Sequence, residues 1–222
     1  MGTRVFAVRI GEKYGQDVED YINSKVPNVT WIREPFDPRV KLQWNKLYPM
    51  SLDIDEPVCV IDIDMGFIGD YMDVFNYPIE RGEYVATQAW WQESDMPQYK
   101  LQGGFQKYYP KDCRYIFDKF MSDPEYWMEY YIKNGTTVGP VNGEQYFIQD
   151  SVTEKLRLKY LPQTWMTRWE DWAHHDLQWL ANANYHFPAD YLYLGEFHPD
   201  VRLLHFQGSN KPHKATLEAL GW

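Results

Sequence analysis

The sequence predicts an α/β fold in which helices flank a mostly parallel central sheet. Val58–Ile61 is a short apolar run rich in β-branched residues, as expected for a strand buried on both faces. Strand-like and helix-like segments alternate through the first third of the chain, which favours parallel pairing through right-handed crossovers. The 222 residues contain no linker, low-complexity stretch or repeat, so we expect one domain over residues 1–222.

The first elements follow from hydrophobic periodicity and from Gly and Pro positions. Alternating or continuous apolar runs predict strands, and apolar residues spaced three to four apart predict helices. The expected order is a strand at residues 4–10, a loop at 11–15, a helix at 17–25, a strand at 29–32, a helix at 41–50 and the strand at 58–61.

The rest of the chain gives weaker signals, read in the same way. The expected order is a helix near Met72, a strand at 84–89, a tight turn at Gln102-Gly103-Gly104-Phe105, helices at 116–121, 125–133 and 143–151, and a last strand at 202–206. Residues 165–193 are aromatic and irregular, and we assign no element there.

Charge and cysteine content exclude several classes of protein. The formal net charge of −10 argues against nucleic-acid binding, which depends on Lys and Arg neutralising phosphates, and against binding to an anionic membrane surface. Cys59 and Cys113 are too few for a disulfide framework. Neither a signal peptide nor an apolar stretch of about 18 residues is visible. We therefore expect a soluble protein in a reducing compartment, the cytoplasm.

Two carboxylates end the predicted strand at residues 58–61. Asp62 and Asp64 stand one residue apart, at the edge of the sheet where ligands of α/β proteins bind. Like charges repel at this distance, and a divalent cation such as Mg²⁺ or Mn²⁺ is the commonest reason for the pairing. The alternative is a cap or a salt-bridged loop. A second Asp-X-Asp, Asp53-Ile54-Asp55, follows no apolar strand and is interpreted as a solvated turn.

The segment after residue 202 supplies the second half of the predicted site. His205 stands at a strand end, where a neutral imidazole is a good third ligand for a divalent ion. Gly208 lets the backbone approach a ligand closely, and Lys211 can offset the negative charge of a diphosphate. The alternative for His205 alone is a packed core histidine.

These motifs resemble those of GT-A-fold glycosyltransferases, in particular the retaining, glycogenin-like group. The resemblance spans nearly the whole chain, and the compact size also resembles that of small glycosyltransferase domains of large algal DNA viruses. The matching segments, in the order of the group, are Asp62-Ile63-Asp64, Gln102-Gly103-Gly104-Phe105, Gly143-Glu144-Gln145, Leu161-Pro162-Gln163-Thr164-Trp165 and His205-Phe206-x-Gly208-x-x-Lys211-Pro212. Four residues depart from the group's pattern, at positions that bear on donor-sugar identity and catalytic detail: Gln102, Glu144, Met166 and His213.

The resemblance implies a Rossmann-like, GT-A-type domain and a metal-dependent enzyme of the hexosyltransferase type. It would move a sugar from a UDP-sugar to a glycan or protein-linked glycan, with retention of configuration, using Mn²⁺ or Mg²⁺. A virus-encoded enzyme would act in the host cytoplasm. The implied roles are metal binding by Asp62, Asp64 and His205; diphosphate binding by Gly208 and Lys211; nucleotide binding by Ala7, Val8, Arg9, Tyr14 and Asp62; contact with the donor sugar by Gly103 and Gly104; orientation of donor hydroxyls by Glu144; and a position near the anomeric carbon for Gln145.

The high aromatic content suggests a sugar-binding surface, and the residues also leave three other classes of protein as alternatives. Trp90, Trp91, Trp165, Trp169 and Trp172 are candidates for an acceptor-sugar platform, although most of the aromatic residues are expected to pack. A sugar-phosphate nucleotidyltransferase is one alternative enzyme, and a phosphatase with an aspartate nucleophile is another. The non-enzymatic alternative is a carbohydrate-binding module.

Overall fold

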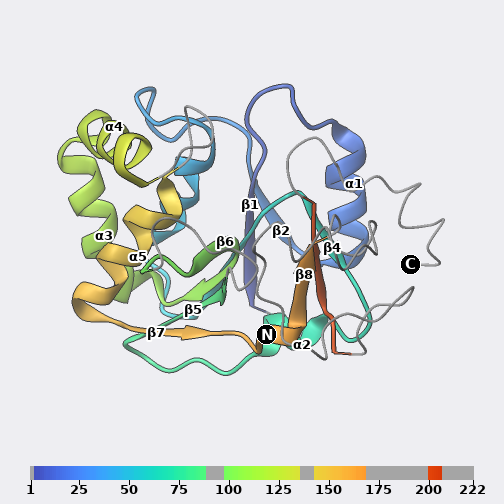
Figure 1. The fold of residues 1–222 in the computed structure, drawn as a ribbon. Coiled ribbons are helices and arrows are strands. Elements are labelled where there is room, and N and C mark those ends of the chain that lie inside the picture. The colour runs from blue at the N-terminus through green and yellow to red at the C-terminus, as the bar shows by residue number, and fades with distance from the viewer. Residues whose placement is uncertain (1–2, 89–97, 136–142, 169–199, 207–222) are drawn as a thin grey trace, which may run out of the picture.

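A computed structural model of the chain describes residues 3–88, 98–135, 143–168 and 200–206 (Figure 1). Its strands are β1 Arg4–Val8, β2 Val29–Ile32, β3 Val58–Ile61, β4 Met65–Phe67, β5 Glu83–Gln88, β6 Leu101–Tyr108, β7 Arg157–Tyr160, β8 Met166–Arg168 and β9 Leu203–His205. One sheet has the strand order β2-β1-β3-β6-β5-β7, and a smaller one has the order β4-β9-β8.

Helices cover both faces of the larger sheet. The α-helices are α1 Gln16–Lys25, α2 Met72–Asn76, α3 Pro110–Ser122, α4 Pro124–Gly135 and α5 Glu144–Lys155, and the 3₁₀ segments are η1 Leu42–Ser51 and η2 Gln163–Trp165. Figure 1 shows α3, α4 and α5 on one side of this sheet, and α1 with the smaller sheet on the other. Within the described ranges, no helix combines the length and the apolar character needed to cross a bilayer.

The sheet is mixed but mostly parallel, which confirms the predicted α/β class. β1 pairs in parallel with both β2 and β3, and β5 pairs in parallel with β7. β6 lies antiparallel between β3 and β5. The strand-helix-strand order of the first third therefore produced the parallel pairing expected of it.

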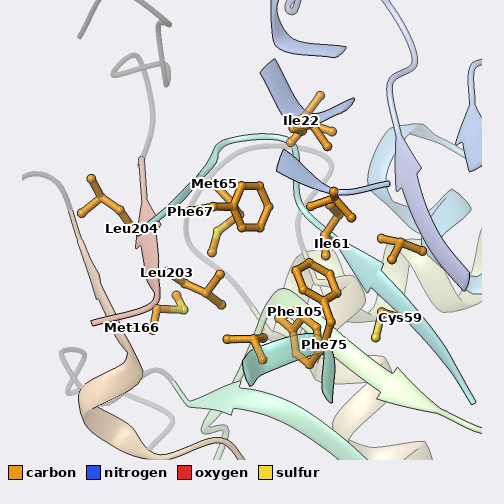
Figure 2. Packing of buried hydrophobic residues seen from close by; sticks show 14 of the residues in the cluster. Ile22, Cys59, Ile61, Met65, Phe67, Phe75, Phe105, Met166, Leu203 and Leu204 are labelled. Atoms are coloured by element: carbon orange, nitrogen blue, oxygen red, sulfur yellow. The ribbon is translucent and has the colours of Figure 1, made fainter. Parts of the chain in front are cut away.

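β3 forms over the predicted residues because both of its faces are buried. Cys59 and Ile61 enter the apolar cluster shared with α1 and the smaller sheet, where Figure 2 shows Ile61 near Phe105. Val58 and Val60 enter the cluster on the face covered by the helices. Burial of a Val or Ile side chain stabilises the fold by about 1.5–3 kcal/mol. A polar residue within the run would lose this stabilisation, and the run contains none.

The predicted helix at residues 41–50 is a 3₁₀ helix, η1, rather than an α-helix. Pro49 lies inside it and has no backbone N–H to donate to an α-helical bond. The Asn45 side chain also bonds locally, donating to the Leu42 carbonyl at 2.9 Å and accepting from the Phe36 N–H at 3.1 Å. Both features favour the tighter winding over a regular α-helix.

The predicted tight turn at residues 102–105 is wrong, because these residues lie within β6. Opposite β5, Gln106 pairs with Ala86 and Gln102 pairs with Thr87, so the intervening residues form a bulge. The Gln102 Oε1 atom accepts the Gly104 N–H at 2.6 Å and the Thr87 hydroxyl at 2.7 Å, which stabilises the bulge. The two glycines mark an irregularity within a strand.

We expect Trp44→Ala to destabilise the protein by about 3–5 kcal/mol, because truncating a buried aromatic residue leaves a cavity. Trp44 is fully buried and stacks on Phe120 with ring centroids 5.3 Å apart. Urea unfolding measures the change. Leu42→Ala on the same segment is the control, because Leu42 is 40% exposed and should cost far less. Equal losses in the two variants would contradict this packing.

Candidate functional site

The candidate metal centre forms where the two sheets meet. Asp62 and Asp64 follow β3, and the Asp62 N–H donates to the Gly104 carbonyl at 2.9 Å. β4 then pairs antiparallel with β9, which sets Met65 opposite His205. This pairing brings a residue near the C-terminal end of the chain beside Asp64, with His205 Nε2 3.8 Å from Asp64 Oδ1.

Asp62, Asp64 and His205 each offer a ligand atom, and these atoms all lie within 4.8 Å of one another. The side chains of Asp62, Asp64 and His205 are partly buried, with exposed fractions of 22%, 21% and 13%. Burial raises the pKa of Asp64, the adjacent His205 opposes this shift, and the neighbouring Asp62 adds to it. Two carboxylate groups and one imidazole are a suitable donor set for Mg²⁺ or Mn²⁺. The predicted residues are together and fit a divalent ion.

Tyr14 lies next to this cluster. Its hydroxyl hydrogen-bonds to the Asp64 side chain, and burial together with the charges of Asp64 and Asp62 raises the pKa of Tyr14. The phenol is thus directed at the candidate metal ligands. Stacking of Tyr14 on a nucleotide base stays a prediction.

The other nucleotide-binding candidates, Ala7, Val8 and Arg9, lie at the end of β1 and just after it, and their role stays a prediction. Ala7 is fully buried in the core, and Val8 packs against the cluster on the helical face. The Arg9 side chain pairs with Glu19 and donates to the Tyr14 carbonyl at 3.2 Å, so it holds the loop at residues 11–15. Glu19, which the sequence did not single out, is buried at the start of α1.

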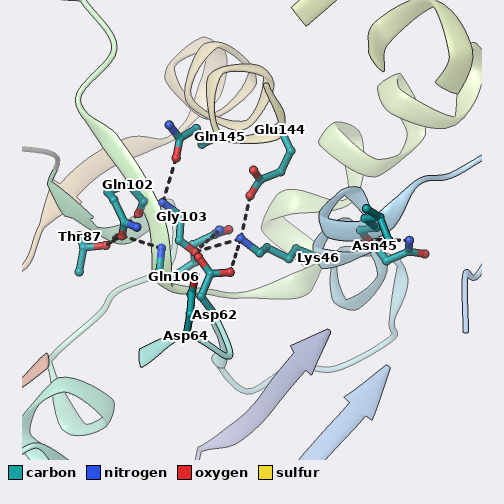
Figure 3. Close-up of polar contacts among 12 residues, drawn as sticks. Asn45, Lys46, Asp62, Asp64, Thr87, Gln102, Gly103, Gln106, Glu144 and Gln145 are labelled. Carbon is teal, nitrogen blue, oxygen red and sulfur yellow. Dashed lines mark hydrogen bonds and ion pairs between the residues drawn. The ribbon is translucent and has the colours of Figure 1, made fainter. Parts of the chain in front are cut away.

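Lys46 is a residue of the site that the sequence reasoning missed. Its Nζ lies 2.6 Å from Asp62 Oδ1 and 3.1 Å from Glu144 Oε1, and its side chain is 6% exposed (Figure 3). Burial by itself lowers the pKa of Lys46, but the two carboxylates outweigh it and the pKa is raised. A single charge among the apolar residues of η1 was the available sequence signal.

Glu144 and Gln145 stand at the start of α5, as predicted. Gly143 precedes them with a φ of +110°, and a Cβ there would lie 2.8 Å from the Tyr131 backbone. Burial raises the pKa of Glu144, and the nearby Lys46 opposes this effect. The Gln145 Oε1 atom accepts the Gly103 N–H at 3.3 Å. The start of this helix, Gly103 and Lys46 therefore share one polar network.

Several predicted site residues lie outside the described ranges, or have packing roles within them. Gly208, Lys211 and His213 lie outside, as do Trp90, Trp91, Trp169 and Trp172. Trp165 is described, with its ring edge-on to Tyr77 at 5.7 Å and the Arg202 guanidinium 5.8 Å from its centroid. Met166 is buried. The second Asp-X-Asp is exposed, with the Asp53 side chain 90% accessible and 2.9 Å from Lys111, in agreement with a solvated loop.

Comparisons with known proteins find a shared fold in solved structures. Neither a protein-family model nor a curated protein matches the chain. The glycosyltransferase GlyE of Streptococcus pneumoniae TIGR4 aligns at 12% identity and a TM-score of 0.58, over 96% of this chain and 56% of that one. The galactosyltransferase LgtC, solved in complex with donor and acceptor sugar analogs, aligns at 12% identity and a TM-score of 0.54, over 96% and 90%.

A third structure is a glycosyltransferase involved in the glycosylation of the major capsid of PBCV-1. It aligns at 13% identity and a TM-score of 0.47, over 91% of this chain and 92% of that one. The chain spans about half the length of GlyE and most of the length of LgtC. The architecture is thus that of GT-A glycosyltransferases, as the motifs predicted, and at these identities the likeness concerns the fold.

We expect Lys46→Met to destabilise the protein by about 3–5 kcal/mol, because it leaves the buried Glu144 carboxylate and the Asp62 charge uncompensated. Adding Glu144→Gln removes one of the two charges and should restore part of the loss. Urea unfolding of the two single variants and the double variant measures the effect. Strictly additive losses would show that the two side chains do not interact.

Proposed function

We propose that this chain is a metal-dependent glycosyltransferase that moves a sugar from a UDP-sugar to a glycan or glycoprotein acceptor, with retention of configuration. The observation that carries the proposal is the clustering of Asp62, Asp64 and His205 within 4.8 Å, in a GT-A fold. The cluster lies at the carboxyl end of β3, where α/β sheets bind ligands. Residues 1–222 form the proposed catalytic domain.

Breaking a sugar–diphosphate bond develops negative charge on the leaving oxygen. Asp62, Asp64 and His205 would hold the cation, and Gly208 and Lys211 are assigned to the diphosphate by their motif. Bound Mn²⁺ or Mg²⁺ supplies Lewis-acid stabilisation of that charge. Tyr14 supports the ligand set through its hydrogen bond to Asp64.

The donor sugar is assigned to the space near Gly103 and the start of α5. Glu144 orients donor hydroxyls, and Gln145 lies near the anomeric carbon. The Lys46 ammonium group, held between Asp62 and Glu144, keeps the Glu144 carboxylate in place. Attack from the face of the leaving group requires no covalent intermediate on the protein, and fixed side-chain positions favour such a reaction.

The structure gives the alternative classes less support. Phosphatases with an aspartate nucleophile place their motif on the first strand, whereas Asp62 follows β3 after β1 and β2. A sugar-phosphate nucleotidyltransferase needs a glycine-rich basic loop after the first strand, and Gly11-Glu12-Lys13-Tyr14-Gly15 matches that pattern poorly. A carbohydrate-binding module does not require clustered Asp62, Asp64 and His205.

We expect UDP with Mn²⁺ to stabilise the protein against unfolding, by about 2.7 kcal/mol at a hundred times the dissociation constant. Thermal shift measures this, and a screen of nucleotide sugars for donor hydrolysis identifies the donor. Asp64→Ala should abolish both the stabilisation and the transfer at any Mn²⁺ concentration.

The matched control for this experiment is Asp53→Ala. Asp53 belongs to the exposed Asp-X-Asp and should leave the response unchanged. Wild-type activity in Asp64→Ala would refute the metal assignment. Stabilisation by free sugar but not by UDP would favour a binding module.

We expect Gln145→Ala to lower turnover while nucleotide affinity stays within a few-fold of wild type. The reason is that Gln145 contacts Gly103, which is assigned to the donor sugar, and is not one of the three candidate metal ligands. Calorimetry with UDP and Mn²⁺, together with steady-state kinetics, separates the two quantities. Strongly weakened nucleotide binding would place Gln145 elsewhere in the site.

A further inference from the structure

We propose that Gln106 is a positioning residue for the donor site, acting through the backbone of Gly103. This inference rests on the proposed function, because it concerns the same site. Gln106 lies within β6 and is 0% exposed, so its side chain acts on substrate only through other groups. No motif identified in the sequence includes it.

The bulge in β6 makes Gly103 available to the site. β6 pairs with β5 at Gln106 and again at Gln102, and the backbone between these pairs leaves the β5 ladder. Buried backbone N–H and C=O groups require partners. At Gly103 those partners are side chains of the candidate site. The bulge therefore turns the Gly103 N–H and carbonyl away from the sheet and toward the site.

Gly103 joins three side chains. Its carbonyl accepts from Gln106 Nε2 at 3.2 Å and from Lys46 Nζ at 3.4 Å. Its N–H donates to Gln145 Oε1 at 3.3 Å. Figure 3 shows Gly103 between Gln145 on one side and Lys46 and Gln106 on the other. A rotation of the backbone at Gly103 would therefore displace Lys46 and Gln145 together.

Gln106 is itself held in one orientation. Its Oε1 accepts a hydrogen bond from the Tyr84 hydroxyl, and Tyr84 is buried and stacked on Tyr108 at 5.2 Å. Because the Gly103 carbonyl can only accept, Nε2 must face Gly103 and Oε1 must face Tyr84. The packed tyrosine pair therefore fixes the Gln106 amide, and the amide in turn fixes the carbonyl of Gly103.

The site leaves little room for another arrangement. A Cβ at Gly103 would lie 3.0 Å from Glu144 Oε1 and 3.2 Å from Lys46 Nζ, so these charged groups already crowd the backbone. Without the Gln106 donor, the Gly103 carbonyl would rely on Lys46, whose ammonium is also shared with Asp62 and Glu144. Hydrogen bonds in a buried network strengthen one another, so removal of one member also weakens the bonds that remain.

The test compares Gln106→Met, which has a similar length but no hydrogen-bonding amide, with Tyr108→Phe. Tyr108 lies on the same strand, is buried, and its hydroxyl has no hydrogen-bond partner in the described structure. For Gln106→Met we expect kcat to fall roughly tenfold to a hundredfold, since small misplacements at a reacting centre are costly. The dissociation constants for Mn²⁺ and UDP should stay within about threefold, and Tyr108→Phe should match wild type.

A second measurement does not depend on activity. Amide hydrogen exchange at Gly103, followed by NMR without donor, should accelerate in Gln106→Met and stay unchanged in Tyr108→Phe. Wild-type exchange at Gly103 in Gln106→Met would overturn the inference even if no nucleotide sugar proves to be a substrate. A wild type that transfers no sugar would count against the proposed function instead.

Two further outcomes decide the inference. Wild-type kcat in folded Gln106→Met, or a loss of UDP affinity as large as the loss of kcat, would overturn it. If Gln106→Met does not fold, Tyr84→Phe replaces it, because this variant removes only the hydroxyl that holds the Gln106 amide. We then expect a smaller fall in kcat at unchanged affinity, and wild-type kcat and Gly103 exchange in this variant would overturn the inference.

Discussion

The buried ammonium group of Lys46 is the constraint on which the arrangement of the site depends. It brings together η1, the end of β3, the bulge of β6 and the start of α5 through Asp62, Gly103 and Glu144. Removing a charge from water costs several kcal/mol unless its partners are well placed. The four segments must therefore meet in one arrangement, and the core on the helical face is joined directly to the candidate site at the sheet edge.

The same constraint explains why β6 is irregular. A regular strand would keep the Gly103 backbone in the β5 ladder, and Lys46 would lose an acceptor. The bulge instead directs the Gly103 N–H and carbonyl to side chains, while Gln102 satisfies the Gly104 N–H that the bulge exposes. The second sheet adds the other half of the site, because β4 and β9 bring His205 to Asp64.

The sequence was most informative where the residues of one short segment are enough to indicate its structure. The run at residues 58–61 predicted β3 because both of its faces are apolar, and the carboxylates after it marked the sheet edge. The sequence did not identify Lys46, because its partner Glu144 is 98 residues away along the chain. It did not identify Gln106 either, because the role of that residue depends on a bulge in β6. The glycines at 103 and 104 suggested a local turn, whereas the pairing of the residues on both sides of them with β3 and β5 keeps them within a strand. The roles of Gly208 and Lys211 stay predictions.

The position of β9 has a consequence for synthesis of the protein. β9 is the middle strand of its sheet, with β4 on one side and β8 on the other, and it is made after both. While the ribosome is still translating the segments before it, Asp62 and Asp64 can already lie at the end of β3, but the imidazole that joins them does not yet exist. The candidate cluster is thus complete only after β9 has been made, so a nascent chain that ends before residue 205 lacks one of its three ligands.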